Sequence, residues 1–233
     1  MKYQSWLSAI NALAVCWMTV LFGGNVLGLD LVEGRSGRLT PLSQRLVGEH
    51  LFQQQRTYTA YRLVHQVTID GNLSDWGQVT PLVLDRYTAE TVRGSLPSPA
   101  DSSAELRALW TSQALYFAVH VRDDAIMSDS GDVWQDDEIE LAIDAAFDRI
   151  SGGADDHQYT VNADGRKTDE GIIAVPQGEG GVRAVSGGWD VEVRIPADLL
   201  HVGALFGNQL MGFSLGLHDD DNGGDWDSYL VWE

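Results

Sequence analysis

The residues that could bind a ligand begin in the stretch GDVWQDDEIELAID, residues 131–144, where a tryptophan precedes a run of carboxylates. Apolar and acidic residues then alternate, the apolar ones being Ile139, Leu141 and Ile143 and the acidic ones Glu138, Glu140 and Asp144. Such alternation is typical of a strand with one buried face. An aromatic ring at the entrance of this strand, with carboxylates on its open face, could form a ligand platform. The alternative is a solvated strand beside a tryptophan that only packs.

A second acidic stretch, HDDDNGGDWD at residues 218–227, offers closely spaced oxygen ligands among glycines. Ca²⁺ binds several carboxylate and carbonyl oxygens in a flexible geometry, although this spacing is not that of an EF-hand loop. We expect a structural Ca²⁺ site either at Asp219 and Asp221 or at the adjacent residues Asp123 and Asp124. The alternative is a solvated acidic turn.

Catalysis is not expected from the acidic residues. Glu138 and Glu140 could supply the paired carboxylates of a glycosidase. They lie two residues apart on one strand, however, and project in parallel instead of flanking a substrate. The sequence also contains no nucleophile elbow, zinc motif or phosphate-binding loop.

The amino-acid composition limits the kinds of ligand that this protein could bind. The 233 residues carry a formal charge of −19, which argues against nucleic acid because phosphate binding requires lysines and arginines. Hydrophobic residues make up 44% of the chain, enough for a sizeable core. Cys16 is the sole cysteine, so the rest of the chain has no disulfide and no cysteine-based metal site.

The N-terminal part differs from the remainder. Residues 1–29 are mostly apolar after Lys2, which indicates either a signal peptide or a membrane anchor that would form an apolar helix. Residues 30–66 are interpreted as a spacer, helical or disordered. Either reading of residues 1–29 places the body of the protein outside the cytoplasm, as a secreted, periplasmic or membrane-anchored protein.

Residues 67–233 show short alternating segments separated by polar turns. Clear examples are ALYFAVHVR at residues 114–122, GWDVEVRIP at residues 188–196 and GFSLGLHD at residues 212–219. Many short strands of this kind predict an all-β fold, an antiparallel sandwich of the immunoglobulin-like or jelly-roll-like type. By its parity within the second segment, Trp189 is expected in the core, and Trp76 and Trp110 are expected there too.

The order of five motifs resembles the family 9 carbohydrate-binding modules, a group of DOMON-like β-sandwiches. The motifs are TIDGNLSDW, AELRALWTSQALYFAVHVRDD, VWQDDEIELAID, GWDVEVRIP and GFSLGLHDDDNGG. The resemblance implies non-catalytic binding of cellulose- or xylan-type chains, with Trp134 stacking on a pyranose ring and Glu140 accepting hydrogen bonds from its hydroxyls. It also implies structural calcium. For Asp137, a structural role within its loop is as much expected as ligand contact.

The sequence departs from the family pattern at several site positions. Thr160, two residues before Asn162, stands where the family can place a sugar-binding arginine, and Gly216 and His218 stand where it can place a glutamine and an asparagine. The family's second stacking tryptophan lies in a closing segment, which this sequence, ending at Glu233, is expected to lack. Trp226 is the candidate to replace it. Thr160 and Asn162 complete the set of predicted sugar-binding residues.

Two other functions remain open at this stage. One is an extracytoplasmic, membrane-anchored sensory or interaction domain that keeps the fold without the sugar site. The other is a haem b protein, since some DOMON-like domains bind haem, with Met127 and either His218 or His120 as ligands. The alternative for these residues is an ordinary loop methionine and surface histidines.

Overall fold

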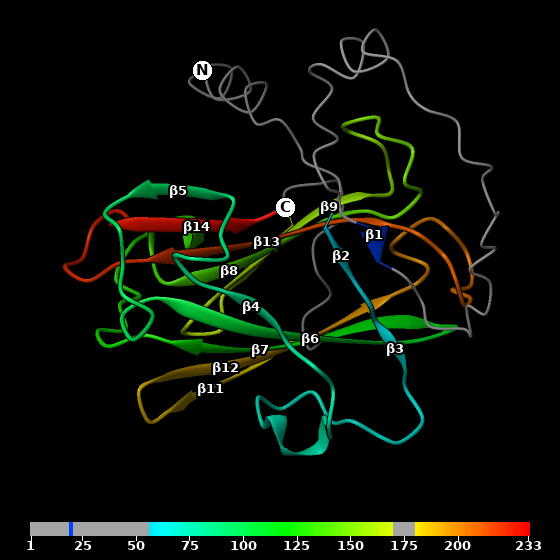
Figure 1. Cartoon of the computed structure of the whole chain (residues 1–233), viewed down its shortest axis with the longest axis horizontal. Coiled ribbons are helices and arrows are strands. Elements are labelled where there is room, and N and C mark those ends of the chain that lie inside the picture. The colour runs from blue at the N-terminus through cyan, green and yellow to red at the C-terminus, as the bar shows by residue number, and fades with distance from the viewer. Residues whose placement is uncertain (1–18, 21–55, 170–179) are drawn as a thin grey trace, which may run out of the picture.

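Two β-sheets form the body of the protein in this computed structural model, which describes residues 19–20, 56–169 and 180–233 (Figure 1). In the first sheet the strands follow the order β10-β9-β8-β13-β14-β5, and all neighbours are antiparallel. Their bounds are β5 Thr91–Gly94, β8 Glu138–Asp144, β9 Asp156–Asn162, β10 Lys167–Asp169, β13 Gly212–Asp219 and β14 Ser228–Trp232.

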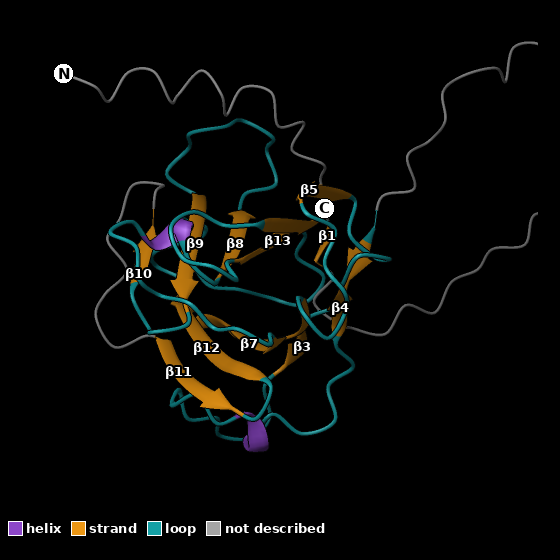
Figure 2. Cartoon of the chain, turned by 90° about the vertical axis from the view of Figure 1, so that its left-hand side faces the viewer, coloured by secondary structure: helices purple, strands orange, loops and turns teal. Residues whose placement is uncertain are grey.

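The second sheet follows the order β11-β12-β7-β6-β3, and β4 also pairs with β6. Its strands are β3 Tyr61–Arg62, β4 Leu82–Leu84, β6 Ser103–Thr111, β7 Ala114–Arg122, β11 Gly180–Val185 and β12 Gly188–Pro196. All pairs are antiparallel except β3 with β6. In Figure 2, β8, β9 and β13 lie in one layer above β7, β11 and β12. The predicted all-β sandwich is therefore confirmed.

The core lies between the two sheets and consists of the apolar residues of the alternating segments. On β7, Phe117 is buried and stacks on Phe213 of β13, with ring centroids 5.5 Å apart and ring planes 8° apart. This contact joins the sheets directly. Trp189 and Trp110 belong to the same core, whereas Trp76 is buried in a smaller cluster with Leu109 and Ala118. All three tryptophans are buried, as predicted.

The sandwich begins before the predicted boundary at residue 67. Tyr61 pairs with Leu109 along the edge of β6, and the backbone N–H of Leu63 donates to the carbonyl of Trp110 at 2.8 Å. Ala60 is buried, and Arg56 Nε lies 2.8 Å from the carboxylate of Glu90. Residues 56–63 are thus part of the domain and not of a spacer. This segment is too short to show an alternating pattern, and its pairing partner is distant in sequence. For these reasons the sequence alone did not assign residues 56–63 to the domain.

The remaining short elements are two 3₁₀ helices, η2 Leu73–Asp75 and η3 Val133–Gln135, and the parallel pair β1 Thr19–Val20 and β2 Thr57–Tyr58. The other residues of the segments 1–29 and 30–55 lie outside the described residues, so the predicted signal or anchor and the spacer stay predictions. Among the residues that the structure describes, no helix has the length and apolar character needed to cross a membrane.

A buried carboxylate explains the motif TIDGNLSDW. Glu192 of β12 is fully buried and accepts hydrogen bonds from the backbone N–H groups of Asp70, at 2.9 Å, and Gly71, at 2.6 Å. The indole N–H of Trp76 donates to its other oxygen at 2.5 Å. Three donors satisfy this charge, which is what a buried carboxylate requires. Glu192 therefore fastens the turn at residues 70–76 to the second sheet.

Candidate functional site

Trp134 lies in η3, at the end of the loop that connects β7 to β8. We call residues 123–137 the platform loop. Trp134 is 43% exposed, although the preceding Val133 is buried and anchors the loop. The carbonyl of Trp134 lies 3.1 Å from Nδ1 of His218 on β13. The backbone is thus held in place while the indole remains available to a ligand.

Glu140 is on the outer face of the first sheet, two residues into the strand that follows. Its partners across the ladder are Thr160 on β9 and Gly216 on β13. The side chain is partly exposed, and the amide of Gln158 donates to its Oε2 at 2.8 Å. An oriented carboxylate of this kind can accept hydrogen bonds from sugar hydroxyls.

An aromatic cluster that the sequence did not predict fills the same face. The ring of His218 stacks on Trp226, with centroids 5.3 Å and planes 15° apart, and meets the edge of Tyr229 at 4.1 Å and 65°. Trp226 is partly exposed, in the loop between β13 and β14. We call this loop, together with the last residue of β13, the acidic loop, residues 219–227. The cluster therefore brings Trp226 to the face that carries Glu140.

Tyr229 explains why Gly216 has no side chain. A Cβ atom at Gly216 would lie 2.9 Å from Cε2 of Tyr229 and 3.1 Å from Cβ of Glu140. The tyrosine ring thus lies over the position where the family can place a glutamine. The outward parity of Gly216, His218 and Tyr229 was visible in the sequence. Predicting that the Tyr229 ring covers Gly216 would also have required the register between β13 and β14.

The charges on this face are mostly negative. Burial lowers the pKa of His218 to about 4, so its imidazole is neutral at pH 7, although Nδ1 lies 2.6 Å from the carboxylate of Glu138. Burial, and then the nearby Glu140 and Glu138 carboxylates, raise the pKa of Tyr229 above its usual value, so its hydroxyl stays protonated. Arg93 of β5 supplies a positive charge 6.0 Å from the centroid of the Tyr229 ring.

The platform loop and the acidic loop are joined by hydrogen bonds. The carboxylate of Asp137 accepts from the backbone N–H of Met127 at 2.5 Å and from that of Asp220 at 2.7 Å. Ser130 Oγ donates to the carbonyl of Gly224 at 2.7 Å. Burial, opposed by the two donating amides, raises the pKa of Asp137 to about 8. The buried Asp137 thus has a structural role in its loop, which is one of the two roles expected for it.

Two predicted sugar-binding residues present little surface. Asn162 is fully buried, and its Oδ1 accepts from the backbone N–H of Arg166 at 2.9 Å. Thr160 is 4% exposed. The structure thus brings Trp134, Glu140 and Trp226 to one region of the molecule and places Thr160 and Asn162 beneath its surface.

The two histidines considered for haem ligation lie on different sheets. His218 belongs to the aromatic cluster of the first sheet. Nδ1 of His120 lies 2.6 Å from Asp190, on β7 and β12 of the second sheet. The described contacts of the two histidines thus join them to protein groups on different sheets.

Among the residues that the structure describes, acidic side chains gather in three groups. Asp219 and Asp221 lie with Asp101, each offering an oxygen within 4.8 Å of the others; the second group is Asp129, Asp136 and Asp220, and the third is Asp144, Asp155 and Asp156. Burial, and then the charge of Asp221, raise the pKa of Asp219 to about 7. Burial also raises the pKa of the nearby Asp123, with a contribution from Asp221. Asp101 is the member of this group that sequence reasoning missed.

Residues 69–233 match the profile of the family described as Carbohydrate family 9 binding domain-like, and the chain belongs to this family. Similar curated proteins include endo-1,4-beta-xylanase A of Thermoanaerobacterium saccharolyticum, 26% identical over 167 residues, and exoglucanase XynX of Acetivibrio thermocellus, 25% identical over 166 residues. These alignments cover 71% and 70% of this chain but only 12% and 14% of the two relatives. The chain therefore spans about an eighth of their length.

Among solved structures, a family 9 module from Caldicellulosiruptor kristjanssonii in complex with cellotriose aligns with a TM-score of 0.60 and 24% sequence identity. The alignment covers 73% of this chain and 83% of that chain. This likeness establishes the shared sandwich fold.

Proposed function

We propose that the sandwich binds β-linked glucan or xylan chains without catalysis, with Trp134 as the stacking platform and Glu140 as a hydrogen-bond acceptor. The observation that carries the proposal is the exposure of Trp134, 43%, at the edge of a face that also holds a partly exposed carboxylate. Trp226, supported by His218 and Tyr229, is the second aromatic residue of the site.

The chemistry of the ligand fits this arrangement. A β-linked pyranose has an apolar face of C–H groups, which stacks on an indole, and a rim of equatorial hydroxyls, which need polar partners. Glu140 offers an acceptor that is already oriented by Gln158. Ordering the acceptor before binding reduces the entropy lost on association.

The type of polysaccharide is inferred from the relatives. The curated relatives are named as xylanases and an exoglucanase, and the related module from C. kristjanssonii was solved with cellotriose. We extend cellulose- and xylan-type ligands to this chain. Such polymers are found outside cells, which supports an extracytoplasmic location, with residues 1–29 as the export signal or membrane anchor.

The test is a tryptophan fluorescence titration of the full chain in buffer with calcium. Cellobiose and xylobiose are the ligands, followed by longer oligosaccharides, and maltose serves as the α-linked control. Saturable quenching or a blue shift with the β-linked sugars is expected, because a sugar that covers Trp134 removes water from the indole. A folded protein whose emission does not change at millimolar ligand would rule the proposal out.

We also propose that Asp219, Asp221 and Asp101 bind a structural Ca²⁺, with Asp123 close to the ion. Hard oxygen ligands are what Ca²⁺ requires, and these carboxylates come from loops that are far apart in sequence. Burial raises the pKa values of Asp219 and Asp123, and neighbouring carboxylates, Asp221 among them, raise them further. A divalent cation would compensate these charges and fasten the acidic loop to residue 101.

A further inference from the structure

The relative position of Trp134 and Trp226 depends on polar contacts between two loops. Asp137 bridges the backbones of Met127 and Asp220, and Ser130 bonds to Gly224. Apart from the short helix η3, the platform loop has no regular secondary structure to hold it. These contacts act on the spacing of the two rings together with His218, which contacts the carbonyl of Trp134 and stacks on Trp226.

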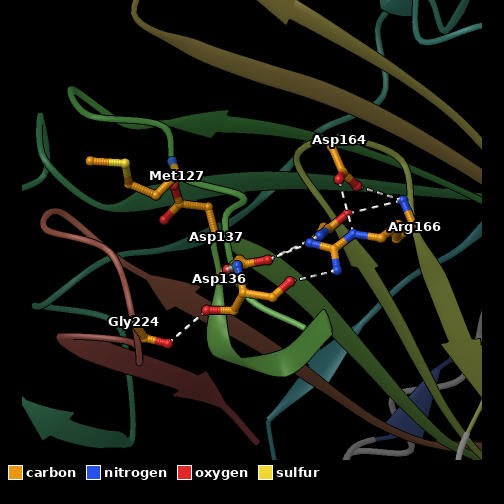
Figure 3. A network of polar contacts seen from close by, with 8 residues as sticks. Met127, Asp136, Asp137, Asp164, Arg166 and Gly224 are labelled. Carbon is orange, nitrogen blue, oxygen red and sulfur yellow. Dashed lines mark hydrogen bonds and ion pairs between the residues drawn. The ribbon is translucent and has the colours of Figure 1, made fainter. Parts of the chain in front are cut away.

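Arg166 reaches this junction from a third segment, the turn between β9 and β10 (Figure 3). Its Nη2 lies 2.5 Å from Oδ2 of Asp136, and its Nη1 donates to the carbonyl of Ser130 at 3.0 Å. The backbone N–H of Ser130 donates in turn to Oδ1 of Asp136 at 2.9 Å. The guanidinium, Ser130 and Asp136 thus close a ring of hydrogen bonds within the platform loop.

The charge of Arg166 has a specific role at this point. Asp136 is fully buried and belongs to the group that also contains Asp129 and the buried Asp220. Two of these carboxylates come from the platform loop and the third from the acidic loop, so their repulsion acts to separate the loops. The positive guanidinium bound to Asp136 offsets this repulsion. Interactions between charges are stronger where solvent is excluded, because the local dielectric constant is lower.

The shape of Arg166 matters as well as its charge. Its Nη1, Nη2 and Nε contact three different acceptors, the third being Asp164 at 2.9 Å from Nε. A lysine ammonium at the same position has a single nitrogen and cannot reach the carbonyl of Ser130 and Asp136 in this fork geometry.

We infer that Arg166 is a positioning residue of the sugar site: through Asp136 and Ser130 it holds the platform loop against the acidic loop and so sets the spacing of Trp134 and Trp226. This inference rests on the proposed sugar-binding function. Arg166 itself acts through the loops and not by contact with the ligand.

The experiment compares the full-length wild type with Arg166→Ala, Arg166→Lys and Asp164→Ala. Asp164 is the matched control, because it is an exposed partner of Arg166 that belongs to neither loop. Cellotriose affinity is measured by calorimetry in one calcium-containing buffer. Hydrogen exchange of the backbone amides of Ser130 and Asp220 is measured on the same samples, because these amides report the platform loop and the junction between the loops.

Both Arg166 variants should bind cellotriose about tenfold more weakly, a change of about 1.4 kcal/mol, and should exchange the two amides faster. Asp164→Ala should match the wild type in both measurements. The inference fails if Arg166→Ala keeps wild-type affinity, or if affinity falls while both amides keep their protection. It also fails if Arg166→Lys behaves as wild type, since charge alone would then suffice.

The same experiment distinguishes failure of this inference from failure of the proposed sugar-binding function. If the wild type binds no β-linked sugar, the sugar-binding proposal falls. Exchange alone then decides whether Arg166 holds the two loops together. Should Arg166→Ala not fold, Arg166→Lys, which retains the charge, provides the same comparison.

Discussion

Replacing Trp134 by alanine provides the most direct test of the platform. Trp134 is 43% exposed, which corresponds to roughly 100 Å² of a large aromatic residue. Covering this surface with a sugar is worth about 2.5 kcal/mol at roughly 25 cal/mol per Å². Its loss should weaken binding roughly 50- to 100-fold. The free energy of unfolding should change little, because the loop is anchored by the buried Val133 and not by the exposed ring of Trp134.

The assay is isothermal titration calorimetry of the full chain with cellotriose, accompanied by thermal unfolding. Tyr87→Ala is the matched control, because Tyr87 is also an exposed aromatic residue, 76% exposed, in a turn between β4 and β5. It should bind as the wild type does. A Trp134→Ala variant whose dissociation constant lies within threefold of the wild-type value would refute the stacking argument, and equal losses in both variants would show that exposed aromatics act nonspecifically.

Three further predictions concern stability and the polar groups around the site. Gly216→Ala should lower the unfolding free energy by about 1–3 kcal/mol and weaken cellotriose binding, because the new Cβ would lie 2.9 Å from the Tyr229 ring; wild-type values in urea titration and calorimetry would contradict the close contact. The folded-state pKa of His218 is lowered to about 4, so the unfolded state binds more protons between about pH 6.5 and 4, and stability should fall as the pH falls through that window. The stability difference between wild type and His218→Phe, measured at fixed calcium, should show this slope, and a difference independent of pH would refute it. Calcium at 100 times its dissociation constant should stabilise the protein by about 2.7 kcal/mol, and Asp219→Asn should remove this gain in thermal unfolding; an identical melting curve in calcium and in chelator would exclude the site.

Local patterns in the sequence account for the strands and for the first half of the site. In residues 114–122 and 138–144, apolar and polar residues alternate, and β7 and β8 form there with the expected faces buried. Trp134 and the carboxylates of β8 could be named because the tryptophan precedes such a strand and the carboxylates have its outward parity. The resemblance to family 9 modules then selected Glu140 among them. This information is contained in neighbouring residues, since side chains of a strand alternate with a period of two.

The contacts between segments depended on tertiary structure. The sequence placed residues 56–63 in a spacer, but they pair with the edge of β6. Asn162 has outward parity and is nevertheless buried by the turn that follows it. The Tyr229 ring over Gly216 depends on the register of β14 against β13, which local alternation does not specify.

The sequence by itself therefore determined that the protein is an all-β sandwich with an aromatic residue and a carboxylate at one strand, because alternation and residue chemistry are local properties. Only the tertiary structure decided that Trp226 reaches the same face, that Asp101 joins Asp219 and Asp221, and that Arg166 closes the junction of the two loops. These features arise where loops distant in sequence meet, and their geometry is set by how the two sheets pack.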